Sequence, residues 1–164
     1  MIRLATSNDL DDILEIYNDV VKNTTAVYDY EPRTREAQLL WFENKTKENY
    51  PIFVAEKNER VVGFASYGQF RPWPAYIHTV EHAIYVSQKF STQGIGTALL
   101  SALIEHAKKN YHSMIAGIDA NNIASIKLHE KFGFVQVGYL KEVGWKFDKW
   151  LDLVFMELLL SERN

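Results

Sequence analysis

The sequence predicts a mixed α/β fold formed as one domain by residues 1–164. Apolar residues recur with strand and helix spacing in the order β-α-α-β-β-β-α-β-α-β-β along the chain. This order contains a strand–helix–strand run, which indicates at least one crossover connection within the sheet. The chain has 164 residues, of which 47% are hydrophobic and 24% charged, so it can bury the core of a globular domain.

The N-terminal part predicts a short strand and two helices. The strand is expected at residues 2–5. Ser7 or Asn8 is expected to cap the first helix, because apolar residues follow at i, i+3, i+4 and i+7, namely Leu10, Ile13, Leu14 and Tyr17. Thr34 is expected to cap the second helix, whose apolar residues are Ala37, Leu40 and Trp41.

The middle of the chain predicts three strands. Residues 52–70 are expected to form a hairpin that turns at Asn58 and Glu59. The segment RPWPAY, residues 71–76, is expected to be a rigid loop, because proline disrupts both helices and sheet ladders. The segment TVEHAIYV, residues 79–86, predicts the third strand, and a glycine-containing loop follows it.

The C-terminal part predicts two helices and three strands. After the glycine loop, apolar residues keep helical spacing at Ile95, Leu99, Ala102, Leu103 and Ala107. Residues 113–119 predict a buried strand, and a short helix in NIASIKLHEKFG is expected to close at Gly133, in a C′ position. Two last strands are expected to run to about Leu160.

Composition excludes several classes of function. The net charge of -3 argues against nucleic acid as the main partner. The absence of cysteine excludes disulfides, a thiol nucleophile and thiolate metal sites. The N-terminal MIRLATSNDL lacks the apolar segment of a signal peptide, and no apolar run approaches the roughly 18 residues that span a bilayer. A cytoplasmic protein without a membrane partner is expected.

The loop before residue 97 carries Gly94 and Gly96, a pattern associated with phosphate binding. A dinucleotide fingerprint requires a third glycine or alanine, where this chain has Leu99, and a Walker loop requires a Gly-Lys-Ser/Thr triplet, which the chain lacks. The free N–H groups at a helix start can still bind a phosphate, and glycine lets it approach closely. From the residues alone, an ordinary turn remains the alternative.

Several separated segments carry a resemblance to a known family. HAIYVSQKFSTQGIGTALLSALIEHA resembles the acetyl-coenzyme A signature of the GNAT N-acetyltransferases, and DANNIASIKLHEKFGF resembles their second signature. TTAVYDYEPRT, RPWPAYIHTVEHAIYV and VGWKFDKWLDLVFMEL are similar to segments of the phosphinothricin/methionine sulfoximine acetyltransferase branch. The resemblance extends from about Ile2 to Leu160. It implies the GNAT fold, a mixed central sheet with helices on both faces, and acetyl-CoA as the acetyl donor.

The resemblance implies which residues bind acetyl-CoA. The family usually has Arg or Gln at the first position of the glycine motif, where this chain has Ser91, so Lys89 or Gln93 is expected to compensate. A backbone N–H near residues 84–86 is expected to stabilise the oxyanion. Ser125 and Asn122, or Asn121 in place of Asn122, are expected to contact the pantetheine arm. The full expected set is Ile84, Tyr85, Val86, Ser91, Thr92, Gln93, Gly94, Ile95, Gly96, Thr97, Asn122 and Ser125.

Two residues are candidates for catalysis. Glu81 interrupts an apolar strand, which from the residues alone fits either a base or a salt-bridged strand residue. The resemblance implies that it is the base, acting directly or through a water. For His129 the resemblance implies protonation of the leaving thiolate, or a hydrogen bond to the sulfur. A helix histidine bonded to a backbone carbonyl is the alternative.

No metal site is expected, although HTVEH, residues 78–82, fits the His-x-x-Glu-His pattern of zinc peptidases. That pattern binds zinc on a helix, whereas four residues of a strand span about 13 Å. Because residues 79–86 predict a strand, both histidines cannot reach one metal ion.

The resemblance also implies the acceptor. Substrates of this branch carry an α-amine and an α-carboxylate, which Arg71 is expected to bind, whereas a second Arg of the family is replaced here by Trp73. Tyr28, Tyr30, Lys146 and Trp150 are expected around the same pocket. A homodimer paired through GWKFDKWLDLVFMEL is expected.

The predicted function is transfer of the acetyl group of acetyl-CoA to the amine of a small amino acid or analogue, by direct attack in a ternary complex. The alternatives are another amine, either a protein N-terminus or a polyamine, and a non-catalytic acyl-CoA-binding module.

Overall fold

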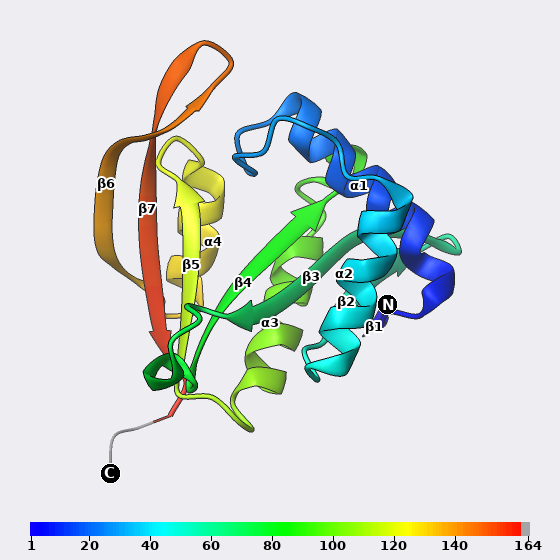
Figure 1. Cartoon of the computed structure of the whole chain (residues 1–164), viewed down its shortest axis with the longest axis horizontal. Helices are drawn as coiled ribbons and strands as arrows, with labels where there is room; N and C mark the ends of the chain where they lie inside the picture. The colour runs from blue at the N-terminus through cyan, green and yellow to red at the C-terminus, as the bar shows by residue number, and fades with distance from the viewer. Residues whose placement is uncertain (162–164) are drawn as a thin grey trace.

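The computed structural model describes residues 1–161 and is organised around one seven-stranded sheet (Figure 1). The strand order is β1-β2-β3-β4-β5-β7-β6, in which only β4 and β5 pair in parallel. The strands are β1 Ile2–Leu4, β2 Ile52–Lys57, β3 Arg60–Gln69, β4 Thr79–Val86, β5 Ser113–Asp119, β6 Val135–Lys146 and β7 Lys149–Leu159. The predicted order of strands and helices is confirmed.

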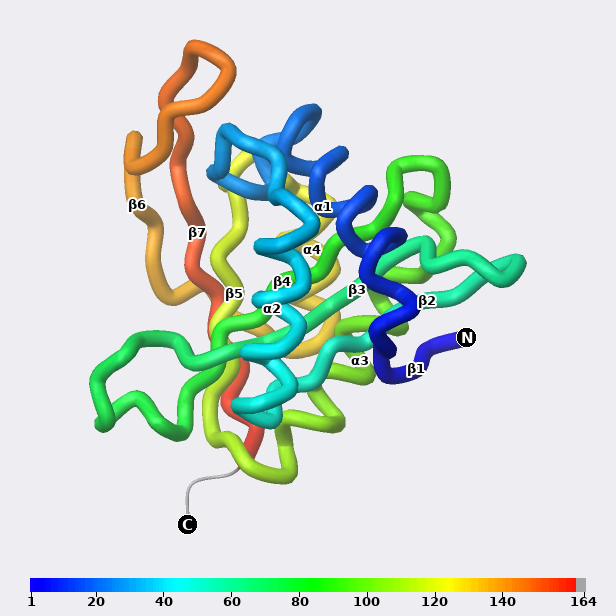
Figure 2. Tube along the Cα trace, turned by 45° about the vertical axis from the view of Figure 1, so that its right-hand side comes forward, coloured from blue at the N-terminus to red at the C-terminus, as the bar shows by residue number. Residues whose placement is uncertain are grey.

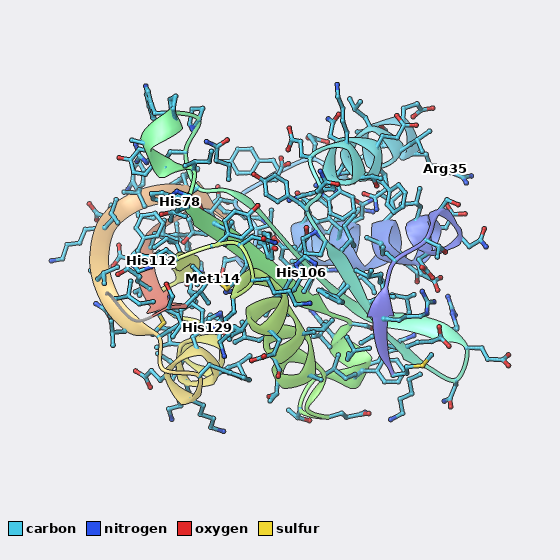
Figure 3. All side chains as sticks on the ribbon, turned by 90° about the horizontal axis from the view of Figure 1, so that it is seen from below. Arg35, His78, His106, His112, Met114 and His129 are labelled. Atoms are coloured by element: carbon cyan, nitrogen blue, oxygen red, sulfur yellow. The ribbon has the colours of Figure 1, made fainter. Side chains whose placement is uncertain are left out.

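Two helices cover each face of the sheet. These are α1 Leu10–Asn23 and α2 Arg35–Lys47 on one face, and α3 Ile95–Ala107 and α4 Ile123–Lys131 on the other (Figures 1 and 3). Each face has its own apolar cluster, one built on Ile13 and Val21 of α1 and the other on Leu99 and Leu103 of α3. The predicted mixed sheet with helices on both faces is confirmed. Within residues 1–161 no helix is long and apolar enough to cross a membrane.

The start of α1 differs from the prediction. Ser7–Asp9 form a 3₁₀ turn, and α1 begins at Leu10. Neither Ser7 nor Asn8 caps the helix, because the Asp9 carboxylate accepts a hydrogen bond from the Thr6 N–H at 2.7 Å and is held by Arg3 at 2.8 Å. A buried carboxylate with these partners fixes the turn, and spacing along the chain does not reveal them.

The other turn and cap predictions are confirmed. The Thr34 hydroxyl accepts a hydrogen bond from the Ala37 N–H at 3.1 Å. Asn58 and Glu59 have φ angles of 51° and 60°, which suit a tight hairpin turn. Gly133 follows α4 with φ 89°, in the left-handed region that favours glycine.

The parallel strands β4 and β5 diverge, and this positions the site. Their pairing ends where His82 lies opposite Ala116. Beyond that point β4 continues to Val86 along β3, while β5 continues to Asp119 along β7. Figure 1 shows the two strands separating toward their C-terminal ends. Strand edges that no neighbour covers therefore face each other across an opening in the sheet.

Candidate active site

A groove of about 680 Å³ occupies the opening between β4 and β5 and extends over the start of α3 and along α4. All of the predicted cofactor residues except Gln93 line it, together with His129. The segments that carry the two signatures are far apart in sequence, and the divergent strands bring them to one groove. Their contact with acetyl-CoA stays a prediction.

The glycine loop forms one end of this groove. Gly94 is the N-terminal cap residue of α3, with φ 77°. A Cβ atom built on Gly94 would meet no protein atom within 4 Å, so the space above it is open. An open approach to free N–H groups at the positive end of a helix suits a phosphate, so the residues present fit a pyrophosphate.

Of the two side chains expected to compensate for Ser91, neither lines the groove: Lys89 lines a different pocket, and Gln93 is bonded to Lys57. The Ser91 hydroxyl donates to the Gln88 carbonyl at 2.9 Å. Gln93 is not part of the groove wall, because its Oε1 accepts a hydrogen bond from Lys57 at 2.6 Å. Two cations on α4, Lys127 and Lys131, line the groove instead. Within residues 1–161 they are the Lys or Arg side chains that line the groove.

Asn122 and Ser125 lie at the first turn of α4. The Asn122 Oδ1 accepts a hydrogen bond from the Ser125 N–H at 3.2 Å, so Asn122 caps the helix. Both residues line the groove. The cap fixes where α4 begins and therefore where His129 lies, two turns further on.

Glu81 lies on the opposite face of β4 from this helix. Side chains alternate along a strand, so Glu81 shares a face with Tyr85, which packs on Tyr17 of α1. Within residues 1–161 no group donates a hydrogen bond or pairs with its carboxylate at 4.0 Å or less. Burial raises the pKa of Glu81, and the charge of Arg71 partly opposes that rise. A half-buried carboxylate with a raised pKa and no fixed partner can accept a proton.

Gly117 of β5 lies directly beside this carboxylate. A Cβ atom at Gly117 would come within 3.3 Å of the Glu81 Oε1 and 3.6 Å of Phe155. Glycine therefore leaves the space in front of the carboxylate clear. The Phe155 ring in turn packs on Phe70, at 6.4 Å between ring centroids.

Arg71 and Trp73 belong to the loop between β3 and β4. The Arg71 guanidinium lies 5.6 Å from the Phe70 ring and 6.0 Å from the Trp73 ring. Both residues are exposed, and this loop projects from the body of the molecule in Figure 2. Arg71 is close enough for its charge to act on Glu81, and within residues 1–161 no carboxylate pairs with its guanidinium.

Lys146 does not line the acceptor pocket as predicted. The residue is buried, and its ammonium donates to three backbone carbonyls, those of Val21 at 2.7 Å, Thr24 at 2.8 Å and Val27 at 2.7 Å. An ammonium has three N–H donors, so none remains for a substrate carboxylate. Lys146 instead ties the end of α1 to the β6–β7 hairpin.

Tyr28 and Tyr30 make the same connection from the α1–α2 loop. The Tyr28 hydroxyl lies 3.1 Å from both an Asp119 carboxylate oxygen and the Asp152 carbonyl, and the Tyr30 hydroxyl donates to the Trp145 carbonyl. Figures 1 and 2 show this loop beside the ends of β5 and β7. Trp150 packs on Trp145 at 4.8 Å and is 60% exposed. A role for these side chains at the acceptor stays a prediction.

His129 has both ring nitrogens in hydrogen bonds within the protein. Its Nδ1 lies 2.7 Å from the Ser125 carbonyl, and its Nε2 lies 3.1 Å from the Nε2 of His82. The first contact agrees with the alternative of a helix histidine bonded to a backbone carbonyl. The strand predicted at residues 79–86, on which the argument against a zinc site depends, is confirmed as β4. Within residues 1–161 no three His, Cys, Asp or Glu side chains are grouped so that they could hold a metal ion.

Comparison with known proteins decides the family. The profile of the acetyltransferase (GNAT) domain matches residues 2–155. The chain belongs to this family. It is 42% identical to the L-amino acid N-acyltransferase MnaT of Escherichia coli, over 99% of this chain and 95% of the relative. It is 45% identical to the L-methionine sulfoximine/L-methionine sulfone acetyltransferase of Pseudomonas aeruginosa, over 98% and 94%.

Solved GNAT structures superpose closely on the chain. An N-acetyltransferase from Staphylococcus aureus has a TM-score of 0.97 and 55% identity, with 98% of each chain covered. A ribosomal-protein-alanine N-acetyltransferase from Brucella melitensis has a TM-score of 0.95 and 46% identity, with 97% of this chain and 99% of that chain covered. A phosphinothricin acetyltransferase from Sinorhizobium meliloti in complex with AcCoA has a TM-score of 0.94 and 37% identity, with 97% of this chain and 87% of that chain covered. These matches confirm the predicted GNAT fold and an acetyl-CoA-dependent N-acetyltransferase.

Some residues of this GNAT site are not predicted by the sequence. A role for His82 beyond the His-x-x-Glu-His pattern has no signal along the chain, because its contact with His129 joins residues 47 positions apart. Lys127 and Lys131 lie four residues apart on α4, a spacing that places them on one helix face and could have signalled them. Gly117 gives no signal along the chain, because its role depends on the neighbouring strand.

The left-handed Gly94 of this GNAT loop yields a direct test. Gly94→Ala is expected to cost about 1–2 kcal/mol of stability, because a Cβ disfavours positive φ, and to weaken acetyl-CoA binding. Denaturant unfolding and calorimetric titration measure the two effects. Gly96→Ala is the control for the stability effect alone, since its Cβ meets Leu128 at an ordinary 3.4 Å, whereas the residue itself lines the groove. Equal stability of wild type and Gly94→Ala would contradict the prediction.

Proposed function

We propose that this protein transfers the acetyl group of acetyl-CoA to the α-amine of a small amino acid or analogue of the methionine sulfoximine or phosphinothricin type. The observation that carries the proposal is the half-buried Glu81 carboxylate, which is unpaired within residues 1–161 and feels the charge of Arg71. A base next to a cation suits a substrate whose amine lies one carbon from a carboxylate. The names of the relatives support the same substrate class.

In this proposal each residue has one role. Glu81 accepts a proton from the ammonium of the acceptor, Arg71 binds its carboxylate, and Trp73 provides an apolar wall. A backbone N–H of residues 84–86 stabilises the oxyanion. The amine attacks the thioester directly, in agreement with the absence of cysteine from the chain.

The test is acetyl-CoA turnover, followed as thiol release, against a panel of amines. The panel contains methionine sulfoximine, methionine sulfone, phosphinothricin, ordinary amino acids, polyamines and a peptide with an N-terminal alanine. Turnover of the first three well above the rest is expected. Tight acetyl-CoA binding without turnover of any amine would instead indicate a non-catalytic binding module.

Arg71→Gln tests the substrate class within that panel. It is expected to raise KM for amino acid acceptors by about 10-fold or more, because a charge-assisted bidentate contact is lost. An amine without a carboxylate should be unaffected. Arg60→Gln, at the β2–β3 turn, is the control. An equal loss for acceptors with and without a carboxylate would exclude the assigned role.

A protein N-terminus is the second candidate acceptor. The Brucella melitensis neighbour, 46% identical to this chain, is described as a ribosomal-protein-alanine N-acetyltransferase. Turnover of the N-terminal alanine peptide above that of methionine sulfoximine would favour this candidate. The exposed Arg71 and Trp73 would then contact a peptide.

We also propose a homodimer formed through β6. The segment GWKFDKWLDLVFMEL cannot be the predicted pairing edge, because most of it is β7, which pairs with β5 on one side and β6 on the other. Strand β6 is at the edge of the sheet, and five of its apolar side chains, Val135, Val137, Tyr139, Val143 and Trp145, are 44–60% exposed. Light scattering is expected to give the mass of two chains, and Val137→Glu is expected to give one. Leu40→Glu, on α2 and 57% exposed in the wild type, is the control. A monomeric wild type would exclude the dimer.

The remaining assignments are proposals of the same kind. Residues 1–164 act as one domain, since the seven strands found in residues 1–161 belong to a single sheet. The cytoplasm is the proposed compartment, in agreement with the lack of cysteine. The net charge of -3 supports a small-molecule acceptor over nucleic acid.

A further inference from the structure

The buried imidazoles of His82 and His129 form one unit at the inner end of the groove. Their rings are nearly parallel, with centroids 5.0 Å apart and an interplanar angle of 7°, and both pack edge-on against Phe134. His82 is 8% exposed and His129 3%. Figure 3 shows His129 between α4 and the sheet. Both residues line the groove at the place where β4 and β5 separate.

The hydrogen bonds of this pair fix where its protons lie. The Ser125 carbonyl can only accept, so the Nδ1 of His129, at 2.7 Å, must carry the hydrogen. In a neutral imidazole the other nitrogen is then an acceptor, and the Nε2 of His129 accepts from the Nε2–H of His82 at 3.1 Å. His82 therefore has a bare Nδ1, which within residues 1–161 is the single buried side-chain nitrogen or oxygen without a partner.

A positive charge on the pair is unfavourable. An imidazolium at His129 would donate through Nε2, and His82 would then hold a buried Nδ1–H without an acceptor. Buried N–H groups without an acceptor are rare in proteins, because each loses its hydrogen bond to water without replacing it. Burial lowers the pKa of His129, and burial together with its neighbour lowers the pKa of His82 to about 3. The pair is neutral at physiological pH.

We propose that His82 is a positioning residue that holds His129 as a neutral hydrogen-bond acceptor, so that His129 has no proton to give to the leaving thiolate. His129 then forms an uncharged wall beside the thioester. The inference rests on the proposed acetyl transfer for its catalytic meaning, while the proton positions rest on the protein alone.

The acetyl transfer balances without a proton from histidine. Glu81 takes one proton from the acceptor ammonium, and the nitrogen then bonds to the carbonyl carbon. The carbon–sulfur bond breaks, and its electron pair leaves with the sulfur. The second proton that the nitrogen must lose passes to the sulfur. The products are the acetamide, the thiol and one proton on Glu81, which is released to water.

The first test is the tautomeric state of the free protein, read from ¹⁵N–¹H correlation spectra of the histidine rings at pH 7. His82→Gln and His129→Gln assign the signals. We expect a protonated Nδ1 and a bare Nε2 for His129, and the reverse for His82. A protonated Nε2 on His129, or an imidazolium, would overturn the proposal. This result does not depend on any acceptor being found, so it is separate from a failure of the proposed function.

The second test separates the hydrogen bond from simple packing. His82→Leu removes the donor, whereas the amide N–H of His82→Gln can replace it. We expect His82→Leu to alter the Nε2 signal of His129 and to lower kcat by about 10- to 100-fold, the effect of a slightly misplaced site. His82→Gln is expected to keep the Nε2 signal of His129 and kcat close to their wild-type values. Equal losses in the two variants would show that His82 acts by filling space, which would overturn its role as a positioning residue.

Discussion

Replacement of Glu81 with glutamine is expected to lower kcat/KM for the acceptor by about 10²–10⁴-fold, the usual contribution of a general base. The amide has the same shape but accepts a proton far more weakly. The dissociation constant of acetyl-CoA is expected to change little, because Glu81 is not among the residues that line the groove. Steady-state kinetics and calorimetric titration measure the two quantities.

The same substitution is expected to stabilise the fold at neutral pH. Burial raises the pKa of Glu81 above its value in the unfolded chain, so the folded state binds its proton more tightly. Stability is therefore lost as the pH rises from about 4.5, the ordinary pKa of a glutamate, through the raised folded value. Glutamine removes this loss. The melting temperature of Glu81→Gln should exceed that of the wild type at pH 8 and approach it at pH 4.

The control for both effects is Glu105→Gln on α3. Its carboxylate pairs with Lys108 at 2.9 Å and is 69% exposed, so neither activity nor melting temperature should change appreciably. Full activity of Glu81→Gln with a saturating acceptor would exclude Glu81 as the base. The melting temperatures of Glu81→Gln and the wild type are compared at pH 4 and at pH 8. The same difference at both pH values would instead show that the Glu81 carboxylate is well solvated in the folded protein.

The fold was predictable because its signals are local. The periods of apolar residues distinguish helices from strands, and Thr34, Asn58 and Gly133 mark a cap, a turn and a helix end from their own chemistry. The point at which β4 and β5 separate has no comparable signal. It depends on the pairing of each strand with a different neighbour, β3 for one and β7 for the other.

The candidate site was predictable in part for the same reason. The glycine loop and the cap of α4 are local motifs, so their residues were found and only Gln93 lies outside the groove. Lys146 was misplaced because its three acceptors are 119–125 positions away in sequence. The bond between His82 and His129 crosses from a strand to a helix. Partners of this kind follow from the fold, and a pattern along the chain does not contain them.

Lys146 carries the second large expected effect. Lys146→Met is expected to reduce the free energy of unfolding by about 2–4 kcal/mol, because three backbone carbonyls lose their donor while the methionine still fills the space. The carbonyls of Val21 and Thr24 lie at the C-terminal end of α1, where a cation is also favoured by the helix dipole. Denaturant unfolding monitored by circular dichroism measures the change, and Lys141→Met, at an exposed position of β6, is the control.

The kinetics of Lys146→Met show whether Lys146 connects two segments of the protein or binds the substrate. If Lys146 holds the α1–α2 loop against the β6–β7 hairpin, Lys146→Met should raise KM for acceptors with and without a carboxylate alike, and more than KM for acetyl-CoA. A substrate ligand would instead affect only carboxylate acceptors, as expected for Arg71→Gln. A selective loss of that kind with unchanged stability would show that the ammonium leaves its three carbonyls and turns to the substrate when the acceptor binds.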